Sequence, residues 1–137
     1  IDAVTTLQPF ATMLMNEGFE SIGNVASVAH GDPDNGNTNY YMTTSFIEEN
    51  PEAVEAWQRA LARASEYAND NPEETREAVV EATGQDAELI AEAPLPNYVA
   101  EIDADTVQRE AEYLVKYGIL DEAPSNEELV WSGAEER

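Results

Sequence analysis

The chain has 137 residues, six of them basic and 29 acidic, so its net charge is −23 and its isoelectric point lies near 4.1. Such a field repels nucleic acid and anionic membranes, which makes both poor partners. The absence of cysteine excludes disulfides and thiolate chemistry, and no apolar run approaches the roughly 20 residues needed to span a bilayer.

The length suffices for one domain with a hydrophobic core. Acidic residues alternate with periodic apolar residues and helix caps, which favours a folded protein over a disordered acidic tail. One interpretation of the acidity is adaptation to high salt, where screening removes the self-repulsion.

The first ten residues, IDAVTTLQPF, predict a strand followed directly by a helix. The run is apolar and rich in β-branched residues, and the Gln8-Pro9 step can open a helix. Polar side chains at such a strand end lie at a sheet edge, where ligands bind. The helix is expected to end near Gly18, and a weak extended segment is expected over residues 22–28.

Residues 30–39, HGDPDNGNTN, form a turn-rich loop that invites a calcium-binding interpretation. The EF-hand pattern fails, because with Asp32 first, Gly36 falls at position 5 and Thr43 at position 12. A solvated turn is favoured over a loose cation site. His30 is the only histidine, and it is interpreted as a surface or loop-packing residue. We therefore expect no metal site and no catalytic residues.

The second predicted strand covers Tyr40–Thr44, and its alternation turns one of Tyr40 and Tyr41 to the core and the other toward the opposite face. A capping box of Ser45 and Glu48 is expected to start a short helical turn. The longest helix is expected to run from Pro51 to about Asp70. Its predicted buried stripe consists of Val54, Trp57, Leu61, Ala64 and Ala68.

Further helices are predicted from their start and stop signals. Asn71-Pro72 starts a helix that ends at Gly84, Asp86 caps a short helix, and residues 94–100 form an extended connector. Asp103 or Asp105 caps the last long helix, which Gly118 stops, and Ser125 with Glu128 forms a capping box. The sequence favours Trp57 and Trp131 as packing residues over ligand-stacking ones.

The order of these segments is itself informative. The strand IDAVTTLQPF, a helix ending in NEGFE, the stretch YYMTTSFIEENPEAVEAW and a late YLVKYGIL follow one another, and an Asn-Glu-Glu-Leu-Val helix follows at 126–130. This order resembles the C-terminal part of the substrate-binding proteins of ABC importers. The most similar branch takes sulfonates, taurine, nitrate and thiamine-pyrimidine precursors, and is called NMT1/THI5-like.

The resemblance implies an α/β, helix-rich fold: the C-terminal portion of a type II periplasmic-binding-protein fold, with few strands and about five helices. Residues 1–131 would form a single domain-like fragment of a two-lobe protein. Within it, residues 1–28 would leave the second lobe, and residues 39–131 would supply the return strand and the C-terminal helices of the first lobe. Residues 132–137 are expected to fray.

The resemblance also implies a solute-binding function without catalysis or cofactor. Thr5, Thr6 and Gln8 are the expected polar ligand contacts, and Tyr41 is the expected aromatic wall. Many relatives carry an acidic residue at the position of Gln8, so its neutral amide suits a neutral or anionic ligand better than a cationic one.

The implied partners are a small-molecule ligand and an ABC permease, and the implied location is extracytoplasmic, periplasmic or as a cell-surface lipoprotein. Uncovered sheet edges and apolar helix faces would favour self-association of the fragment. Two alternatives remain: an acidic helical interaction domain, and a pyrimidine-synthase-like enzyme of the same fold. The enzyme would need a suitably placed histidine, and His30 is the only one in the chain.

Overall fold

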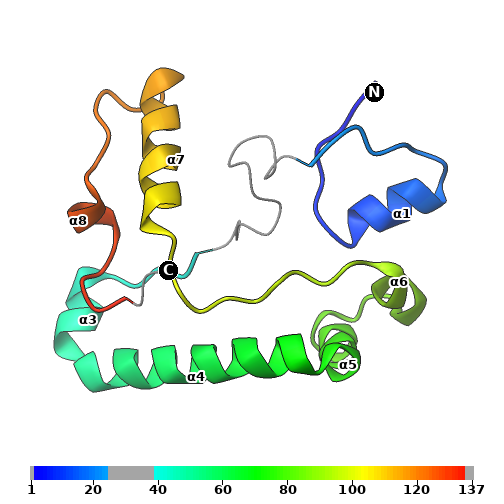
Figure 1. The fold of residues 1–137 in the computed structure, drawn as a ribbon, viewed down its shortest axis with the longest axis horizontal. Helices are drawn as coiled ribbons and strands as arrows, with labels where there is room; N and C mark the ends of the chain where they lie inside the picture. Colours follow the sequence, from blue (N-terminus) through cyan, green and yellow to red (C-terminus); the bar gives the residue numbers. More distant parts are fainter. Residues whose placement is uncertain (1, 25–38, 135–137) are drawn as a thin grey trace. The chain divides into compact units, whose positions relative to one another are not determined.

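A computed structural model describes residues 2–24 and 39–134 of the chain (Figure 1). These residues contain seven α-helices, with a single bridge residue at Ile102 and no strand. The described part is therefore helix-rich, as the sequence predicts. None of its helices is long and apolar enough to cross a membrane.

The two predicted strands are not formed in the described residues. Residues 2–7 and 39–43 belong to neither a helix nor a strand, although both stretches have the β-branched and aromatic composition of strands. A strand is stable only when its backbone hydrogen-bonds to a neighbouring strand, and the described residues supply no such neighbour. Composition alone therefore gave the wrong secondary structure at these two places.

The first helix, α1 (Phe10–Asn16), begins directly after the Gln8-Pro9 step, as predicted. It ends at Glu17, whose backbone N–H bonds to carbonyls of the last turn. Gly18 follows with φ +92°, a left-handed conformation that favours glycine. The predicted end of this helix is thus confirmed.

The short helix α3 (Thr44–Glu49) starts one residue earlier than its predicted cap. Its N-cap is Thr43, whose hydroxyl accepts a hydrogen bond from the Phe46 N–H at 3.3 Å. The predicted capping box of Ser45 and Glu48 is wrong, because Ser45 lies inside the first turn. Thr43 and Ser45 are both good caps, and the sequence did not distinguish them.

The longest helix, α4 (Pro51–Asp70), has the predicted bounds and appears as one continuous helix in Figure 1. Val54 is buried, and Trp57, Leu61 and Ala68 are half-buried, which confirms most of the predicted stripe. Ala64 is exposed, however, and Ser65 is buried instead. The stripe shifts by one residue here because a helix has 3.6 residues per turn, so positions three and four apart compete for one face.

Two helices follow α4 in the same order as predicted: α5 (Pro72–Thr83) and α6 (Ala87–Glu92). Gly84 ends α5 in the left-handed conformation at φ +68°, and Asp86 caps α6 by accepting from two backbone N–H groups. The α5 and α6 helices pack against each other, and α1 packs against α6.

The last helices are α7 (Ala104–Lys116) and α8 (Asn126–Leu129), which also pack together. Asp103, the first of the two predicted candidates, caps α7 by accepting from the Thr106 N–H at 3.0 Å. The Ser125–Glu128 capping box of α8 is confirmed. Trp131 is half-buried, and its ring lies so close to Gly133 that a Cβ there would be 2.6 Å from it.

Contacts divide the chain into two compact units. Within the described residues, the first unit comprises 2–24 and 64–98, and the second comprises 39–63 and 99–134. Ile90 and Ala93 are the buried apolar residues of the first unit, and Val54 and Ala111 those of the second. The domain boundaries expected from the sequence stay a prediction.

Candidate functional site

Three of the four predicted ligand contacts lie in the segment that leads into α1. Thr5 is exposed, Thr6 is half-buried, and Gln8 is exposed beside the first turn of the helix. Residues 2–7 are neither helix nor strand, although the Leu7 carbonyl already accepts a hydrogen bond from the Ala11 N–H of α1 at 3.1 Å. The three predicted polar contacts therefore lie close together in the sequence, directly before α1.

Gln8 has a defined contact, because its side chain caps α1. The Thr12 hydroxyl donates to Gln8 Oε1 at 2.8 Å, and the Thr12 backbone N–H donates to the same oxygen at 3.3 Å. Thr12 is only 5% exposed, and Pro9 at the N-cap makes no side-chain cap bond. Gln8 thus supplies the acceptor that the N-terminus of α1 needs.

This contact also fixes which way the Gln8 amide is turned. The Thr12 N–H is a donor, so the atom that faces it must be the amide oxygen and not the nitrogen. The Nε2 group then lies on the other side of the amide and presents N–H donors. Such donors suit a ligand that offers oxygen acceptors.

The fourth predicted contact, Tyr41, belongs to the second unit. Its side chain is 86% exposed. The neighbouring Tyr40 packs its ring against Trp57 edge to face, with ring centroids 4.8 Å apart. Tyr40 is nevertheless 65% exposed, so neither tyrosine faces the core and the predicted division of the two is wrong. The contact of half-buried Trp57 with Tyr40 confirms the packing role predicted for Trp57.

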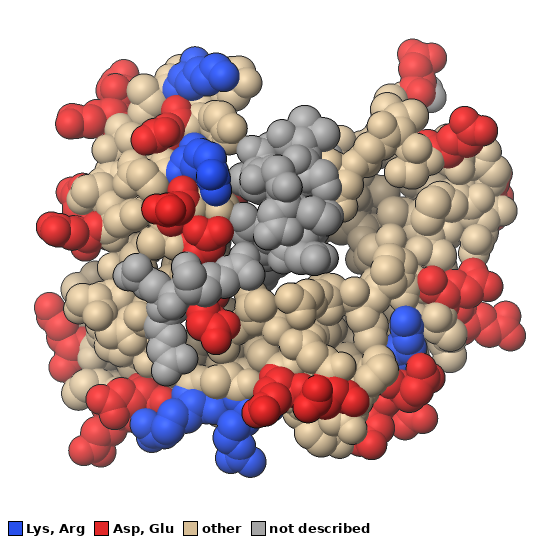
Figure 2. Space-filling model, in the orientation of Figure 1, with Lys and Arg blue, Asp and Glu red and all other residues tan. Residues whose placement is uncertain are grey.

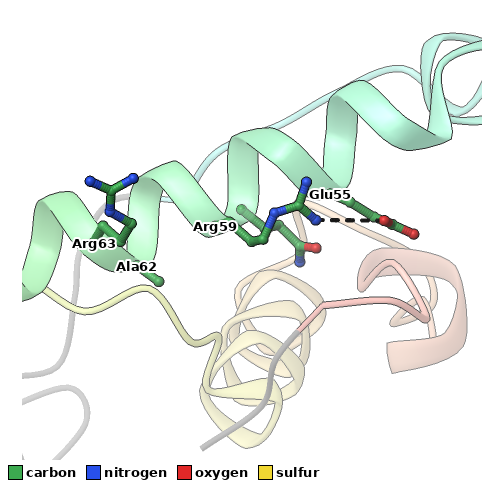
Figure 3. A pocket seen from close by; sticks show the side chains of 5 residues that line it. Glu55, Arg59, Ala62 and Arg63 are labelled. Carbon is green, nitrogen blue, oxygen red and sulfur yellow. Dashed lines mark ion pairs between the residues drawn. The ribbon is translucent and has the colours of Figure 1, made fainter.

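Sequence reasoning did not single out a shallow hollow on α4, which Figure 3 shows. Its volume is about 440 Å³, and it is lined by Glu55, Gln58, Arg59, Ala62 and Arg63. Arg59 forms an ion pair with Glu55 at 3.6 Å, and both side chains are about two-thirds exposed, so the pair contributes little stability. Arg59 and Arg63 lie four residues apart on one helix, and this spacing is the sequence signal that could have pointed to the hollow.

A second hollow, of about 350 Å³, lies on α5 and α6 around Arg76. The Arg76 guanidinium is already used, because Nη1 donates to the backbone carbonyls of Ile90 and of Ala93, the latter at 2.7 Å. Three glutamates, Glu73, Glu77 and Glu81, line the same hollow. The Arg76 guanidinium thus donates to the carbonyls at the end of α6, and the hollow around it is not a preformed site for an anion.

The described residues contain no group of three or more histidine, cysteine, aspartate or glutamate side chains that could hold a metal ion. His30 and the Asp32–Asn37 turn lie outside the described residues.

In the part of the chain that the structure describes, the pKa values of Tyr67 and Glu128 are shifted, and both shifts come from structural contacts. The Glu74 carboxylate accepts from the Tyr67 hydroxyl and raises the pKa of Tyr67. The Ser125 backbone N–H and hydroxyl donate to Glu128 and lower the pKa of that carboxyl. Neither group lies near the predicted ligand contacts in sequence, so neither indicates a catalytic site.

Comparison with known proteins gives one informative match. The model of the family described as NMT1/THI5 like matches residues 1–75, more than half of the 137-residue chain. The chain belongs to the NMT1/THI5-like family. The resemblance inferred from the order of segments is thereby confirmed at the level of the family. Searches of curated proteins and of solved structures returned no match.

The family match covers every predicted ligand contact. Thr5, Thr6, Gln8 and Tyr41 all fall within residues 1–75, as does α4. The α6, α7 and α8 helices lie beyond the matched region. Membership of this family is consistent with a solute-binding protein or a related family member.

Proposed function

We propose that this chain is part of the extracytoplasmic solute-binding component of an ABC importer. It would capture a small organic or anionic solute, of the sulfonate, taurine, nitrate or pyrimidine-like class, in a cleft between two lobes of a type II periplasmic-binding-protein fold. It would then pass the solute unchanged to a permease. The observation that carries this proposal is the NMT1/THI5-like match over residues 1–75.

Gln8 supports the choice of ligand class. Its amide oxygen accepts two bonds from Thr12, so its Nε2 donor is the group that a ligand would meet. A donor pairs with the oxygens of a sulfonate, a nitrate or a pyrimidine carbonyl, whereas an acidic residue at this position would favour a cation. Thr5 and Thr6 would add hydroxyls that donate and accept, and Tyr41 would supply an aromatic wall.

The acidic surface and the partners follow from the same proposal. A net charge of −23 favours solubility in a salty exterior, where charges are screened. The permease is the expected protein partner, and catalysis and a bound cofactor are not expected. A pyrimidine-synthase-like enzyme of this family is the second candidate, and conversion of a bound solute would distinguish it. An acidic helical interaction domain would bind no small solute at all.

Substitutions at Gln8 test the proposal, because they separate its capping bond from its donor. Gln8→Glu keeps an oxygen that accepts from Thr12 but replaces the Nε2 donor with a second acceptor. We expect this variant to melt within about 2 °C of the wild type, because a glutamate carboxylate can still accept the capping hydrogen bonds from Thr12. We expect its affinity for a sulfonate or nitrate to fall at least about tenfold, since a donor is replaced by a like charge.

Two further variants complete this test. Gln8→Ala removes both the cap and the donor, so it should lose stability and binding together. Asn97→Asp adds the same charge at an exposed residue of the 94–100 connector and should change neither. Binding measured by calorimetry and melting followed by circular dichroism check these outcomes. Binding by Gln8→Glu as tight as that of the wild type would contradict the assignment of Gln8 as a ligand contact.

A further inference from the structure

The side chain that caps α1 is an amide, although 29 residues of the chain carry carboxylates. The α6 and α7 helices begin at Asp86 and Asp103, whose carboxylates accept from backbone N–H groups of the first turn. Gln8 supplies the same kind of acceptor to α1 with its Oε1 atom, but it carries no charge. Acidic side chains are spread over the face of the molecule that Figure 2 shows, whereas residues 3–16 contain none. Capping therefore accounts for the Gln8 oxygen but not for its Nε2 group.

Thr12 holds the far end of the Gln8 side chain. Thr12 is only 5% exposed, and both its hydroxyl and its backbone N–H donate to Gln8 Oε1, at 2.8 and 3.3 Å. Gln8 is itself exposed, so without these bonds its side-chain torsions would be free to change in solvent. Within the described residues, no hydrogen bond involves Gln8 Nε2. Thr12 thus fixes the amide oxygen and leaves the two Nε2 donors available.

A similar contact at the start of α7 shows why the amide matters. Thr106 is also 5% exposed, and its hydroxyl and N–H donate to the Asp103 carboxylate at 2.8 and 3.0 Å. A carboxylate has two equivalent oxygens, so turning it does not change what it presents to its surroundings. An amide has an acceptor at one end and donors at the other, so turning it exchanges them. Thr12, unlike Thr106, therefore decides which hydrogen-bonding group its partner presents.

We propose that Thr12 is a positioning residue that makes the Gln8 contact selective for ligands with oxygen acceptors. This inference rests on the proposed function, because it takes Gln8 as a ligand contact. A ligand that offers only donors, such as a guanidinium ion, can bind the amide oxygen only after the amide has turned. That turn would bring Nε2 against the Thr12 N–H and leave two donors facing each other, which opposes the binding of such a ligand. Thr12 acts through Gln8, because its own side chain is buried.

Three variants separate this role from a contribution to stability alone. Thr12→Val removes the hydroxyl but keeps the shape of the side chain, so only the longer N–H bond still holds the Gln8 amide. Thr12→Ser keeps a hydroxyl and should behave as the wild type. Thr106→Val is the control, because it removes an equally buried hydroxyl that bonds to a helix cap in the other unit. It should change stability without changing Gln8.

NMR relaxation of the Gln8 Nε2 group tests the positioning without any ligand. We expect a restricted amide in the wild type, in Thr12→Ser and in Thr106→Val, and a lower order parameter in Thr12→Val, where the stronger of the two bonds is lost. A Gln8 amide that is as mobile in the wild type as in Thr12→Val would show that Thr12 does not position it.

Nitrate and guanidinium are matched probes for the selectivity. Both ions are planar and small, but nitrate offers only acceptors and guanidinium only donors. Titrations followed at the Gln8 Nε2 signal give a Kd for each ion at this residue, and the ratio of the two measures the selectivity. We expect the wild type to prefer nitrate and this preference to fall at least about threefold in Thr12→Val, the usual effect of losing one hydrogen bond. Thr12→Ser should restore the preference, and Thr106→Val should keep it.

The outcomes distinguish this inference from the proposed function. An equal loss of affinity for both ions in Thr12→Val, or no loss for either, would overturn the role of Thr12, since a purely structural residue leaves the ratio unchanged. A wild-type chain with a restricted Gln8 amide that responds to neither nitrate nor methanesulfonate would instead contradict Gln8 as a ligand contact. The selectivity would then be withdrawn together with the proposed site, while the positioning of the amide by Thr12 would stand.

Discussion

Single residues at helix ends have the clearest functions in this chain. Gln8, Thr43, Asp86 and Asp103 each accept a hydrogen bond from an N–H at the start of a helix. Such contacts typically contribute about 1 kcal/mol each, and an acidic cap also interacts favourably with the helix dipole. Part of the strongly acidic composition is thus used to start helices.

Glu128 gives a prediction about pH. Its pKa is lowered from the ordinary value of 4.5 by the Ser125 N–H and hydroxyl, which donate to the ionised carboxylate. A lowered folded-state pKa contributes stability that is present above the ordinary value and lost as the pH falls through the lowered one. We expect the Ser125 amide resonance, followed by NMR, to shift over a range centred below pH 4.5.

The control for this titration is Glu128→Gln. Its neutral amide can still accept from Ser125 but does not ionise, so the Ser125 transition should vanish while α8 persists at neutral pH. A Ser125 transition centred at or above 4.5, or one that survives in Glu128→Gln, would contradict the assigned contact.

At the scale of helices, sequence signals located most of the described elements. Proline, glycine and acidic caps marked α4, α5, α6 and α7 because these residues act on their own backbone neighbours. The predictions failed where the structure of a residue depends on partners that are distant in the sequence. A strand needs another strand to pair with, and the choice of Ser65 over Ala64 as a buried residue depends on what α4 packs against.

The candidate site, like the helices, could be predicted from the sequence only in part. The sequence placed Thr5, Thr6 and Gln8 beside a helix start, and the family match supports the comparison that selected them. The sequence did not show that the Gln8 amide oxygen accepts two hydrogen bonds from Thr12. These bonds leave the Nε2 donor on the side of the amide that does not face Thr12. The contacts of Arg76 were also unpredictable, since they join residues 14 and 17 positions apart through packing of α5 on α6.

Arg76 carries the prediction at this scale. Arg76→Met keeps the aliphatic stem but removes the donor to the carbonyls of Ile90 and Ala93, two of the few buried residues. We expect a loss of about 1–3 kcal/mol in the free energy of unfolding, the usual effect of leaving buried polar groups unpaired. Urea denaturation followed by circular dichroism measures it.

Arg63→Met is the matched control, because Arg63 lies exposed on α4 and its loss should change the free energy of unfolding by less than about 0.5 kcal/mol. Equal effects of the two substitutions would show that the loss reflects overall charge and not the end of α6.

The whole molecule is dominated by its charge. With 29 acidic and six basic residues, repulsion opposes the folded state, and screening should relieve it. We expect the melting temperature to rise by several degrees between about 0.05 and 1 M NaCl, where the screening length shortens from over 10 Å to about 3 Å. Circular dichroism melts measure the change.

Neutralising variants separate screening from general salt effects. Glu73→Gln, Glu77→Gln and Glu81→Gln combined on α5 remove three charges around one hollow, so this variant should gain stability in dilute buffer and respond less to salt. A melting temperature that stays constant or falls with NaCl would show that repulsion does not limit the fold.

The solute-binding function is tested most directly by calorimetric titration of this chain with taurine, an alkanesulfonate, nitrate and an aminopyrimidine. Each solute is recovered afterwards and examined by NMR. The proposal predicts saturable one-to-one binding of one of these solutes, with a Kd of about 1 µM to 1 mM, and its recovery unchanged. Binding of none of them, or recovery of a chemically converted solute, would contradict it.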